Sequence, residues 1–371
     1  MKILHLASSM RGGAGIAASR LVNALIERGI DVKLLYADKF NIVRLAIEKI
    51  FYLFHEKSKE DRFQFSTGMI GENIVRKKAF KEADIIHLHW INNGFISIKG
   101  LQKIINSGKR IIWTFHDAWA FTGGCHYPLW CTKYTTSCGF CHYLNLDKMK
   151  RRDLSYRVFR KKAKIDYSKV TVIAPSQWMA SCAAKSYLFK NKNIHRISNV
   201  LPPPRKHKEN RYILFVACNV HNKIKGFDYF ISAMKQIDAS IPIMIAGKSY
   251  GGETNLFNQE VILKRPEDIM EVYTEAYMTV VPSLQENLGN VVLESMLCGT
   301  PVVAFNVGGM PEIIEHKKNG YLAKYQSSDD LATGIQWILD HKLNVKLKIP
   351  NAVEEHIKLY ENILRITKTV K

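Results

Sequence analysis

Short apolar runs that favour β-strands alternate with segments of helical periodicity along almost all of the 371 residues. The first run, residues 3–6, is followed by residues 16–28, in which apolar residues recur at helical spacing. Runs of the strand type also cover residues 32–37, 85–88, 111–115, 170–174, 213–217, 241–246, 279–281 and 302–305. Strands separated by helices form parallel sheets with helices on both faces, so we expect an α/β fold.

The alternation is interrupted at residues 200–211. Pro202, Pro203 and Pro204 cannot continue a strand or a helix, and basic and polar residues follow them. We therefore expect two Rossmann-like domains, residues 1–200 and 201–350, at about 150 residues per domain. Residues 351–368 have helical periodicity and predict a terminal helix that packs back on the N-terminal domain. Two facing sheets predict a cleft, with ligands bound beyond the carboxyl ends of the strands.

The chain carries 54 Lys and Arg residues against 33 Asp and Glu residues, a formal net charge of +21. This charge favours anionic partners, which include nucleic acid, anionic lipid and phosphorylated ligands. The sequence has no nucleic-acid recognition motif, and its aromatic residues do not interleave with the basic runs, so we expect no nucleic-acid partner. No apolar run reaches the roughly 18 residues of a spanning helix. Arg11 and a glycine cluster follow the apolar start too early for a signal peptide, so we expect a cytoplasmic protein.

The first of three loops with phosphate-binding character is residues 11–15, which contains Gly12, Gly13, Ala14 and Gly15 directly before a helix. Glycine lets the backbone approach a ligand closely, and a helix N-terminus offers unpaired N–H groups with a partial positive charge. The alternative is a plain tight turn between a strand and a helix.

The second loop, residues 219–226, places Lys223 and Lys225 just before Gly226 and a helix. Cations at this point can hold a diphosphate together with helix N–H groups. Taken alone, the same stretch is more typical of a solvated loop with ordinary lysines.

The third loop, residues 282–294, is the most specific motif of the chain. A strand ends at residue 281, Glu286 lies in the loop, and Glu294 lies about two turns into an apolar helix. A carboxylate in the loop can accept hydrogen bonds from sugar hydroxyls, and one further along can bind the paired hydroxyls of a ribose. Gly289 and its neighbours place free N–H groups for phosphates between them. The pattern predicts a sugar-nucleotide site; the alternative is two unrelated surface glutamates.

These residues resemble the retaining glycosyltransferase family 4, which has the GT-B fold. The likeness runs over most of the chain, in dispersed motifs at residues 12–15, 21–32, 83–89, 114–117, 174–176, 225–226 and 286–294. Residues 123–127 are similar to a subgroup that builds bacterial exopolysaccharide, colanic-acid-type or O-antigen chains.

The resemblance implies a role for each motif residue. Glu286 would contact the donor sugar, Glu294 would bind the ribose, and Lys225 would hold the diphosphate. His116 would face the donor sugar and the acceptor, although its spacing alone fits a structural histidine equally well. Backbone N–H groups would come from Asn287, Leu288 and Gly289.

The second loop departs from the family pattern. Family members carry an arginine five residues before the lysine that matches Lys225, and here this position is Val220. Lys223 is the candidate substitute, although lysine lacks the bidentate fork of arginine.

The resemblance implies transfer, with retention, from a UDP- or GDP-linked sugar to a saccharide acceptor, expected to be lipid-linked. The acceptor would attack on the leaving-group side, with the phosphate accepting its proton. No cofactor is expected for catalysis, since no D-x-D metal motif occurs in a plausible loop. The alternatives are a sugar-nucleotide epimerase or phosphorylase of the same fold, a non-catalytic partner of a transferase complex, or a basic nucleic-acid- or membrane-binding protein.

Four cysteines cluster with C-x5-C-x6-C-x2-C spacing: Cys125, Cys131, Cys138 and Cys141. The last pair suits one edge of a tetrahedral zinc site that four thiolates would close, so a structural zinc ion is one hypothesis. Reduced cysteines in a packed loop are the other. The isolated cysteines are expected in the core: Cys182, Cys218 and Cys298.

Two segments favour contact with a membrane surface. Residues 148–169 contain ten basic residues, and residues 40–54 are rich in apolar residues, with Arg44 and Lys49 among them. Docking on an anionic leaflet would gain about 1 kcal/mol per basic residue near the surface, and a lipid-linked acceptor would make it useful. The alternative is a solvated charged face together with an amphipathic core helix.

Overall fold

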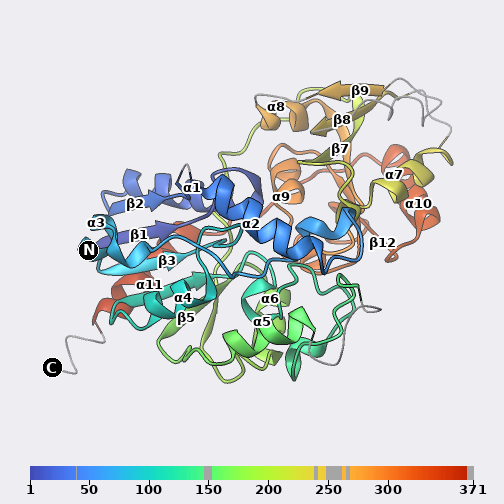
Figure 1. Ribbon diagram of the computed structural model, residues 1–371. Helices are drawn as coiled ribbons and strands as arrows, with labels where there is room; N and C mark the ends of the chain where they lie inside the picture. Colours follow the sequence, from blue (N-terminus) through green and yellow to red (C-terminus); the bar gives the residue numbers. More distant parts are fainter. Residues whose placement is uncertain (39, 146–152, 238–240, 248–260, 265–267, 366–371) are drawn as a thin grey trace. The chain divides into compact units, whose positions relative to one another are not determined.

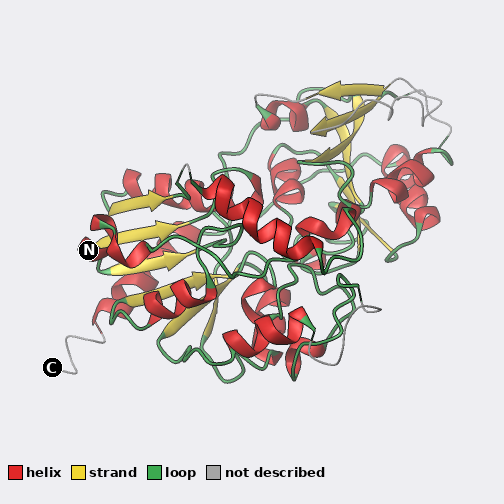
Figure 2. Cartoon of the chain, viewed as in Figure 1, coloured by secondary structure: helices red, strands yellow, loops and turns green. Residues whose placement is uncertain are grey.

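The computed structural model describes residues 1–38, 40–145, 153–237, 241–247, 261–264 and 268–365. The chain divides into two compact units: unit 1 is Met1–Val200 with Pro350–Lys371, and unit 2 is Leu201–Ile349 (Figure 1). Each unit is built around one parallel sheet with helices packed against it (Figure 2).

Unit 1 has a six-stranded sheet in the order β2-β1-β3-β4-β5-β6, in which every pair is parallel. Its strands are β1 (Lys2–Leu6), β2 (Asp31–Leu35), β3 (Ile85–Leu88), β4 (Arg110–Thr114), β5 (Val170–Ala174) and β6 (Ile194–Arg196). Its helices are α1 (Gly12–Glu27), α2 (Asn41–Leu53), α3 (Lys78–Glu82), α4 (Ile98–Ile105), α5 (Leu154–Lys162), α6 (Gln177–Lys185) and α11 (Ala352–Arg365).

The two faces of this sheet are buried against different helices, because successive side chains of a strand point to opposite faces. Ile3 and Ile85 pack with residues of α1 and α11, and the neighbouring Leu4 and Ile86 belong to the larger core on the other face. The C-terminal helix α11 therefore covers the same face as α1. Residues 366–368, the end of the helix predicted from sequence, lie outside the described residues.

Unit 2 has a six-stranded parallel sheet in the order β12-β11-β10-β7-β8-β9. Its strands are β7 (Tyr212–Ala217), β8 (Ile243–Gly247), β9 (Val261–Lys264), β10 (Ala276–Val281), β11 (Val302–Phe305) and β12 (Gly320–Ala323). Its helices are α7 (Phe227–Met234), α8 (Ile269–Thr274), α9 (Asn290–Leu297) and α10 (Ser328–Asp340), with a short 3-10 helix η6 (Lys223–Lys225) before α7. Counted along the chain, this is the strand order of a dinucleotide-binding fold.

The predicted α/β class with parallel sheets is confirmed. Three strands have no counterpart among the predicted runs, namely β6, β9 and β12, and each lies at an edge of its sheet. All three strands have only three or four residues, and β6, with the sequence Ile-His-Arg, also lacks the continuous apolar run of a central strand. Within the described part of the chain, no helix has the length and apolar character to cross a bilayer.

Candidate functional site

The strand order of unit 2 reverses beside β7, which pairs with both β8 and β10. After β7 the chain continues to β8 on one side, and after β10 it continues to β11 on the other side, so the loops that follow β7 and β10 diverge at this point of the sheet. Ligands of open α/β sheets bind at this switch point. The second and third loops singled out from the sequence follow β7 and β10, so both lie there.

These two loops are fastened to each other by their backbones. The N–H of Leu284 donates to the carbonyl of Ile224 at 2.8 Å. Gly226 has φ +71°, and a Cβ atom on it would lie 1.9 Å from the carbonyl oxygen of Pro282. Only glycine permits this close approach in the left-handed region. The contact fixes the end of η6 against the start of the loop that carries Glu286.

Lys225 and Glu286 meet across this junction. The Nζ atom of Lys225 lies 2.5 Å from Oε1 of Glu286, and the hydroxyl of Ser283 donates to the same oxygen at 3.0 Å. Both charged side chains are partly exposed, 26% for Lys225 and 16% for Glu286. A cation and a carboxylate are therefore held side by side at the edge where a ligand would enter.

The loop that follows β11 contacts the backbone of Glu286. The N–H of Gly309 donates to the carbonyl of Glu286 at 3.1 Å. Gly308 has φ +60°, and a Cβ atom there would lie 1.8 Å from that same oxygen. A glycine at position 308 is therefore required for the backbone position of Glu286.

Helix α9 begins at Asn290, directly after the loop residues Asn287, Leu288 and Gly289. Its apolar residues enter the core of unit 2, which fixes the helix, and its N-terminal N–H groups lie at the loop. Glu294 lies in the second turn and is buried, with 6% of its surface exposed. The residues of the third loop that are expected to bind the sugar nucleotide thus follow one another from the loop into the helix.

The departure from the family pattern has a structural counterpart. Val220 is 1% exposed and belongs to the core of unit 2, so it cannot contact a phosphate. Lys223, the candidate substitute, is exposed at the start of η6.

Unit 1 presents its expected site residues at the equivalent edge of its own sheet. Its order changes direction beside β1, which pairs with β2 and β3. Helix α1 begins at Gly12 after β1, so Gly13 and Ala14 lie in its first turn. A Cβ atom on Gly15 would lie 2.2 Å from the carbonyl oxygen of Ser9, which explains a glycine at this position.

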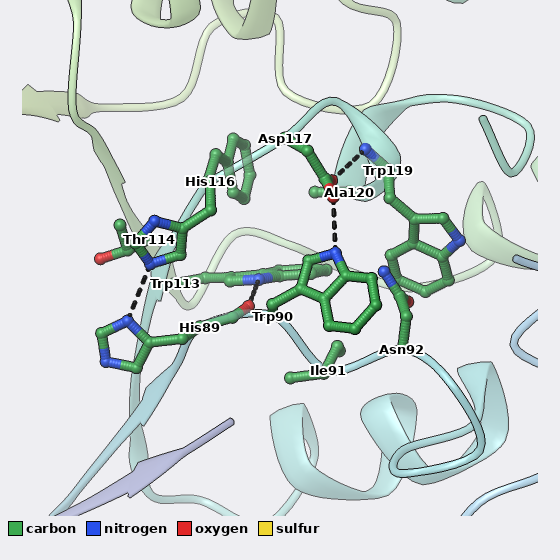
Figure 3. A pocket seen from close by; sticks show the side chains of 11 residues that line it. His89, Trp90, Ile91, Asn92, Trp113, Thr114, His116, Asp117, Trp119 and Ala120 are labelled. Atoms are coloured by element: carbon green, nitrogen blue, oxygen red, sulfur yellow. Dashed lines mark hydrogen bonds between the residues drawn. The ribbon is translucent and has the colours of Figure 1, made fainter. Parts of the chain in front are cut away.

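His116 follows β4 and ends a chain of three imidazoles. Its Nε2 atom lies 3.0 Å from Nδ1 of His89 (Figure 3), and Nε2 of His89 lies 2.9 Å from Nδ1 of His5. His5 and His89 are buried, whereas His116 is partly exposed and lines a small cavity. Burial lowers the pKa of His116 to about 4 against the opposing effect of Asp117, and burial together with His356 lowers the pKa of His5 to about 3.

The same cavity contains polar residues that the sequence reasoning missed. Asp117 Oδ2 accepts from the indole N–H of Trp90 at 2.6 Å (Figure 3). The same oxygen lies 2.7 Å from Nδ1 of His126. Burial raises the pKa of Asp117, but His126 and the hydrogen bonds outweigh it and hold that pKa below its usual value. Asn92 is 2% exposed, and its Oδ1 has no hydrogen-bond partner among the described residues. In the sequence, the only indication of this hydrogen-bonded network is that Asp117 directly follows His116.

The expected site residues therefore fall into two groups. Unit 2 brings together Lys225 and Glu286 and places Lys223, Asn287, Leu288, Gly289 and Glu294 in the same loops and helix. Unit 1 carries Gly13, Ala14 and His116. The cleft expected between the two domains stays a prediction.

The zinc hypothesis for Cys125, Cys131, Cys138 and Cys141 stays a prediction. In the described part of the chain, the one set of three or more His, Cys, Asp or Glu ligand atoms within 4.8 Å of one another is His5, His87 and His89. Sulfur ligands of one zinc ion lie about 3.8 Å apart, given Zn–S bonds of about 2.3 Å. Cys125, Cys138 and Cys141 are buried in the core of unit 1, where the thiols of Cys125 and Cys141 contact each other and Cys138 Sγ accepts from the N–H of Gly123 at 3.1 Å.

In this set of three histidines, five of the six ring nitrogens are engaged in hydrogen bonds, and Nε2 of His5 has no partner among the described residues. His87 Nδ1 lies 2.8 Å from the Tyr360 hydroxyl and its Nε2 lies 2.8 Å from the Thr114 hydroxyl. Both nitrogens of His89 are engaged in the imidazole chain.

Two further expectations are corrected. Cys298 is buried, but Cys182 is only partly buried and Cys218 is exposed. Lys162, counted in the basic run, is not on a solvated face: it is fully buried, its ammonium donates to the carbonyls of Trp119 and Thr122, and it lies over the Trp119 ring. Residues 148–152 of that run lie outside the described residues.

Comparison with known proteins identifies the family and the fold of the chain. A model described as Glycosyltransferase Family 4 matches residues 11–205, and one described as Glycosyl transferases group 1 matches residues 210–341. A protein of Haemophilus influenzae named an uncharacterized glycosyltransferase is 31% identical over 169 residues, 41% of this chain and 47% of that protein. The chain thus spans about half of that relative.

A second relative covers nearly the whole chain. It is named an uncharacterized 41.2 kDa protein in the cps region of Klebsiella pneumoniae, and it is 25% identical over 354 residues, 89% of this chain and 87% of that protein. Among solved structures, Anabaena HepE in complex with UDP-glucose has a TM-score of 0.58 at 16% identity, over 100% of both chains. At this identity the likeness shows the fold, and with the two parallel sheets it confirms the predicted GT-B class.

Proposed function

The chain belongs to glycosyltransferase family 4 and is a glycosyltransferase, and we propose that it moves a sugar, with retention, from a UDP- or GDP-linked donor to a saccharide acceptor. We further propose that the acceptor is lipid-linked and that the product is a bacterial surface polysaccharide. The Lys225–Glu286 pair at the switch point of unit 2 is the observation that carries the proposal.

Each member of that pair suits one part of a sugar nucleotide. Lys225 and the N–H groups at the start of α9 offer positive charge to a diphosphate. Glu286 offers a carboxylate to the hydroxyls of the sugar next to it, and the buried Glu294 lies a turn further on for the ribose. The similar fold of Anabaena HepE, whose structure was solved in complex with UDP-glucose, supports a nucleotide-linked sugar donor.

In the proposed reaction the bond between the anomeric carbon and the diphosphate oxygen breaks, and a bond from that carbon to the acceptor oxygen forms on the same face. The proton of the acceptor hydroxyl passes to the departing diphosphate. Lys225 stabilises the charge that develops on the leaving group, which is the largest contribution that a preorganised site makes to such a step. Glu286 orients the sugar.

Substitution of the pair tests this proposal. Lys225→Ala and Glu286→Ala are each expected to lower sugar transfer by at least about a hundredfold, the cost of removing one preorganised charge. Their circular dichroism should match that of the wild type. Lys235→Ala, an exposed lysine at the end of α7, is the matched control and should retain full transfer. Wild-type rates in both site variants would exclude the proposed site.

A membrane-bound acceptor is supported by the orientation of α2. The residues on its outer side are all apolar and exposed, among them Ile42 at 77%, Val43 at 58% and Ile50 at 56%. The remaining exposed large apolar residues of this segment are Phe40, Ile47, Leu53 and Phe54. An amphipathic core helix would bury these residues, so their exposure favours a surface helix for residues 40–54.

The charged residues of α2 point inward instead. Glu48 is buried and accepts from the Thr67 hydroxyl at 2.9 Å and from the N–H of Gly68 at 2.8 Å. Arg44 donates to the carbonyl of Gly94 at 2.9 Å. The inner contacts thus anchor a helix whose outer apolar surface suits the boundary of a lipid layer.

The net positive charge of the chain is carried by unit 1, the unit that contains α2. Unit 1 holds 38 Lys and Arg residues against 17 Asp and Glu residues, whereas unit 2 holds 16 of each. The whole net charge of +21 is therefore carried by unit 1. We propose that α2 rests on an anionic membrane surface, attracted by this charge, and that the reaction takes place on the cytoplasmic face.

A further inference from the structure

A loop of unit 1 that takes no part in the proposed reaction exposes two large aromatic side chains. The six tryptophans all lie within the described residues, and one of them, Trp130, is exposed, at 73%. Phe140 of the same loop is 48% exposed. We call residues 127–143 the aromatic loop; Lys133 is its one Lys or Arg residue, and it contains no Asp or Glu. Burial of such rings would stabilise the protein, so their joint exposure indicates a partner.

The conformation of the loop does not explain its aromatic residues. Phe140 has φ +50°, in the left-handed region, where glycine is favoured and a bulky residue is strained. Leu129, directly before Trp130, has φ +54°. A strained and half-exposed Phe140 lowers the stability of the fold without filling the core, which is typical of a residue retained for function.

Side-chain contacts hold the loop in this shape. The Nζ atom of Lys133 donates to the carbonyl of Phe140 at 3.3 Å and lies 5.4 Å from the centre of its ring. Trp130 stacks on His142 with ring centroids 4.9 Å apart. The two exposed rings are therefore presented on a defined framework.

Both ends of the aromatic loop are fastened beside the C-terminal end of α2. Before the loop, the N–H of His126 donates to the carbonyl of Gln64 at 2.9 Å. After the loop, the N–H of Asn145 donates to the carbonyl of His55 at 2.9 Å. His55 and Gln64 flank a segment that ends in the exposed Phe63. The loop, this segment and the end of α2 are therefore neighbours.

Phe63 connects the outer side of α2 with this region. The Nζ atom of Lys49 lies 4.3 Å from the centre of the Phe63 ring. Lys49 precedes the exposed Leu53 by about one turn, so it borders the outer apolar side of α2. The exposed apolar surface of the helix thus continues through Phe63 toward the aromatic loop.

We propose that Trp130 and Phe140 insert into the same anionic lipid surface as α2 and form a second anchor of unit 1. This anchor rests on the proposed function, in which α2 lies on the membrane. A lipid layer is the partner that fits, because aromatic rings suit the membrane interface, tryptophan above all. The loop has no carboxylate that would repel anionic headgroups, and unit 1 carries the whole net charge of +21. A helix alone can roll on a surface, whereas a helix and a loop beside it fix the orientation of unit 1.

Quenching of tryptophan fluorescence by brominated acyl chains tests the insertion without a transfer assay. Vesicles of phosphatidylcholine and phosphatidylglycerol with such chains are expected to quench the wild type. Trp130→Phe keeps an apolar ring, so it should still bind the vesicles but lose most of the quenching. Trp337→Phe, in α10 of unit 2, is the matched control and should be quenched like the wild type.

The outcomes separate the second anchor from the rest of the account. Sedimentation of the wild type with vesicles, but equal quenching in Trp130→Phe and the wild type, would overturn the second anchor and leave α2 on the membrane. No sedimentation with anionic vesicles would overturn both. Transfer to a soluble saccharide acceptor measures the proposed reaction independently and should be unchanged in Trp130→Phe.

Phe140→Gly distinguishes a binding role from a structural one. Glycine relieves the left-handed backbone, so thermal unfolding should stay close to that of the wild type, whereas sedimentation with vesicles should fall several-fold. Ile26→Ser, which also removes an exposed apolar side chain, should sediment like the wild type. Lower thermal stability with unchanged vesicle binding would contradict the proposal. A dimer in solution that dissociates in Phe140→Gly would also overturn it, because a second copy of the chain would then cover the loop.

Discussion

At the scale of single residues, unit 1 buries histidines that stay neutral. Burial lowers the pKa of His5 to about 3 and the pKa values of His116 and His356 to about 4. A histidine in an unfolded chain has a pKa of about 6.5. Between that value and pH 4 the unfolded chain therefore binds protons that the folded chain does not.

This difference predicts a loss of stability in acid. The contribution of these histidines is complete above about pH 6.5 and falls as the pH decreases, by up to about 1.4 kcal/mol per pH unit for each ring. Denaturant unfolding at about pH 7 and about pH 5 measures the change. His5→Phe removes one titrating ring, so the difference between the two pH values should be smaller in the variant. An equal difference in both proteins would show that His5 does not titrate as described.

At the scale of elements, the junction of η6 with the loop after β10 depends on Gly226. Alanine at this position meets both a positive φ and the carbonyl oxygen of Pro282. Gly108 also has a positive φ, +79°, but a Cβ atom there would have no other atom within 4 Å. Gly108→Ala therefore has only the conformational cost, about 1 kcal/mol.

Gly226→Ala is therefore expected to lose clearly more stability than Gly108→Ala and to lower transfer at least about tenfold, since Lys225 moves away from Glu286. Thermal unfolding and sugar transfer measure the two effects. If both alanine variants behaved alike, the close approach of the two loops would not be needed for the site.

Helix α2 is the second element with a testable role. Ile42→Ser with Ile50→Ser is expected to lower sedimentation with vesicles of phosphatidylcholine and phosphatidylglycerol several-fold, because serine removes the apolar contact with the lipid layer. Ile26→Ser, an exposed apolar residue of α1, is the control. Binding should weaken with salt and with less anionic lipid. Unchanged binding of the double variant would remove α2 from the docking surface.

At the scale of the whole molecule, periodicity was enough to predict the α/β class, because central parallel strands are continuous apolar runs. The edge strand β6, with the sequence Ile-His-Arg, has no such run and was not predicted. Lys225 and Glu286 were singled out by their places after strands. Their contact joins residues 61 positions apart and depends on the glycines at 226 and 308, so it could not be read from the sequence.

Other features could not be predicted from the sequence, because a residue of one type can lie either in the core or at the surface. Trp90, Asp117 and His126 belong to one hydrogen-bonded network, but in sequence they look like separate core residues. Lys162 looks like one more surface lysine of a basic run, although it is buried against Trp119. The apolar side of α2 has the period of a core helix, and only the structure reveals that it faces outward.

The central claim is that the Lys225–Glu286 junction of unit 2 holds a sugar nucleotide by its diphosphate, and calorimetric titration with UDP- and GDP-linked sugars tests it most directly. The wild type is expected to bind at least one of them, and Lys225→Ala is expected to bind it at least about tenfold more weakly, a loss of about 1.4 kcal/mol. Lys235→Ala should bind like the wild type. Equal affinity of Lys225→Ala and the wild type, or no binding of any nucleotide-linked sugar, would contradict the account.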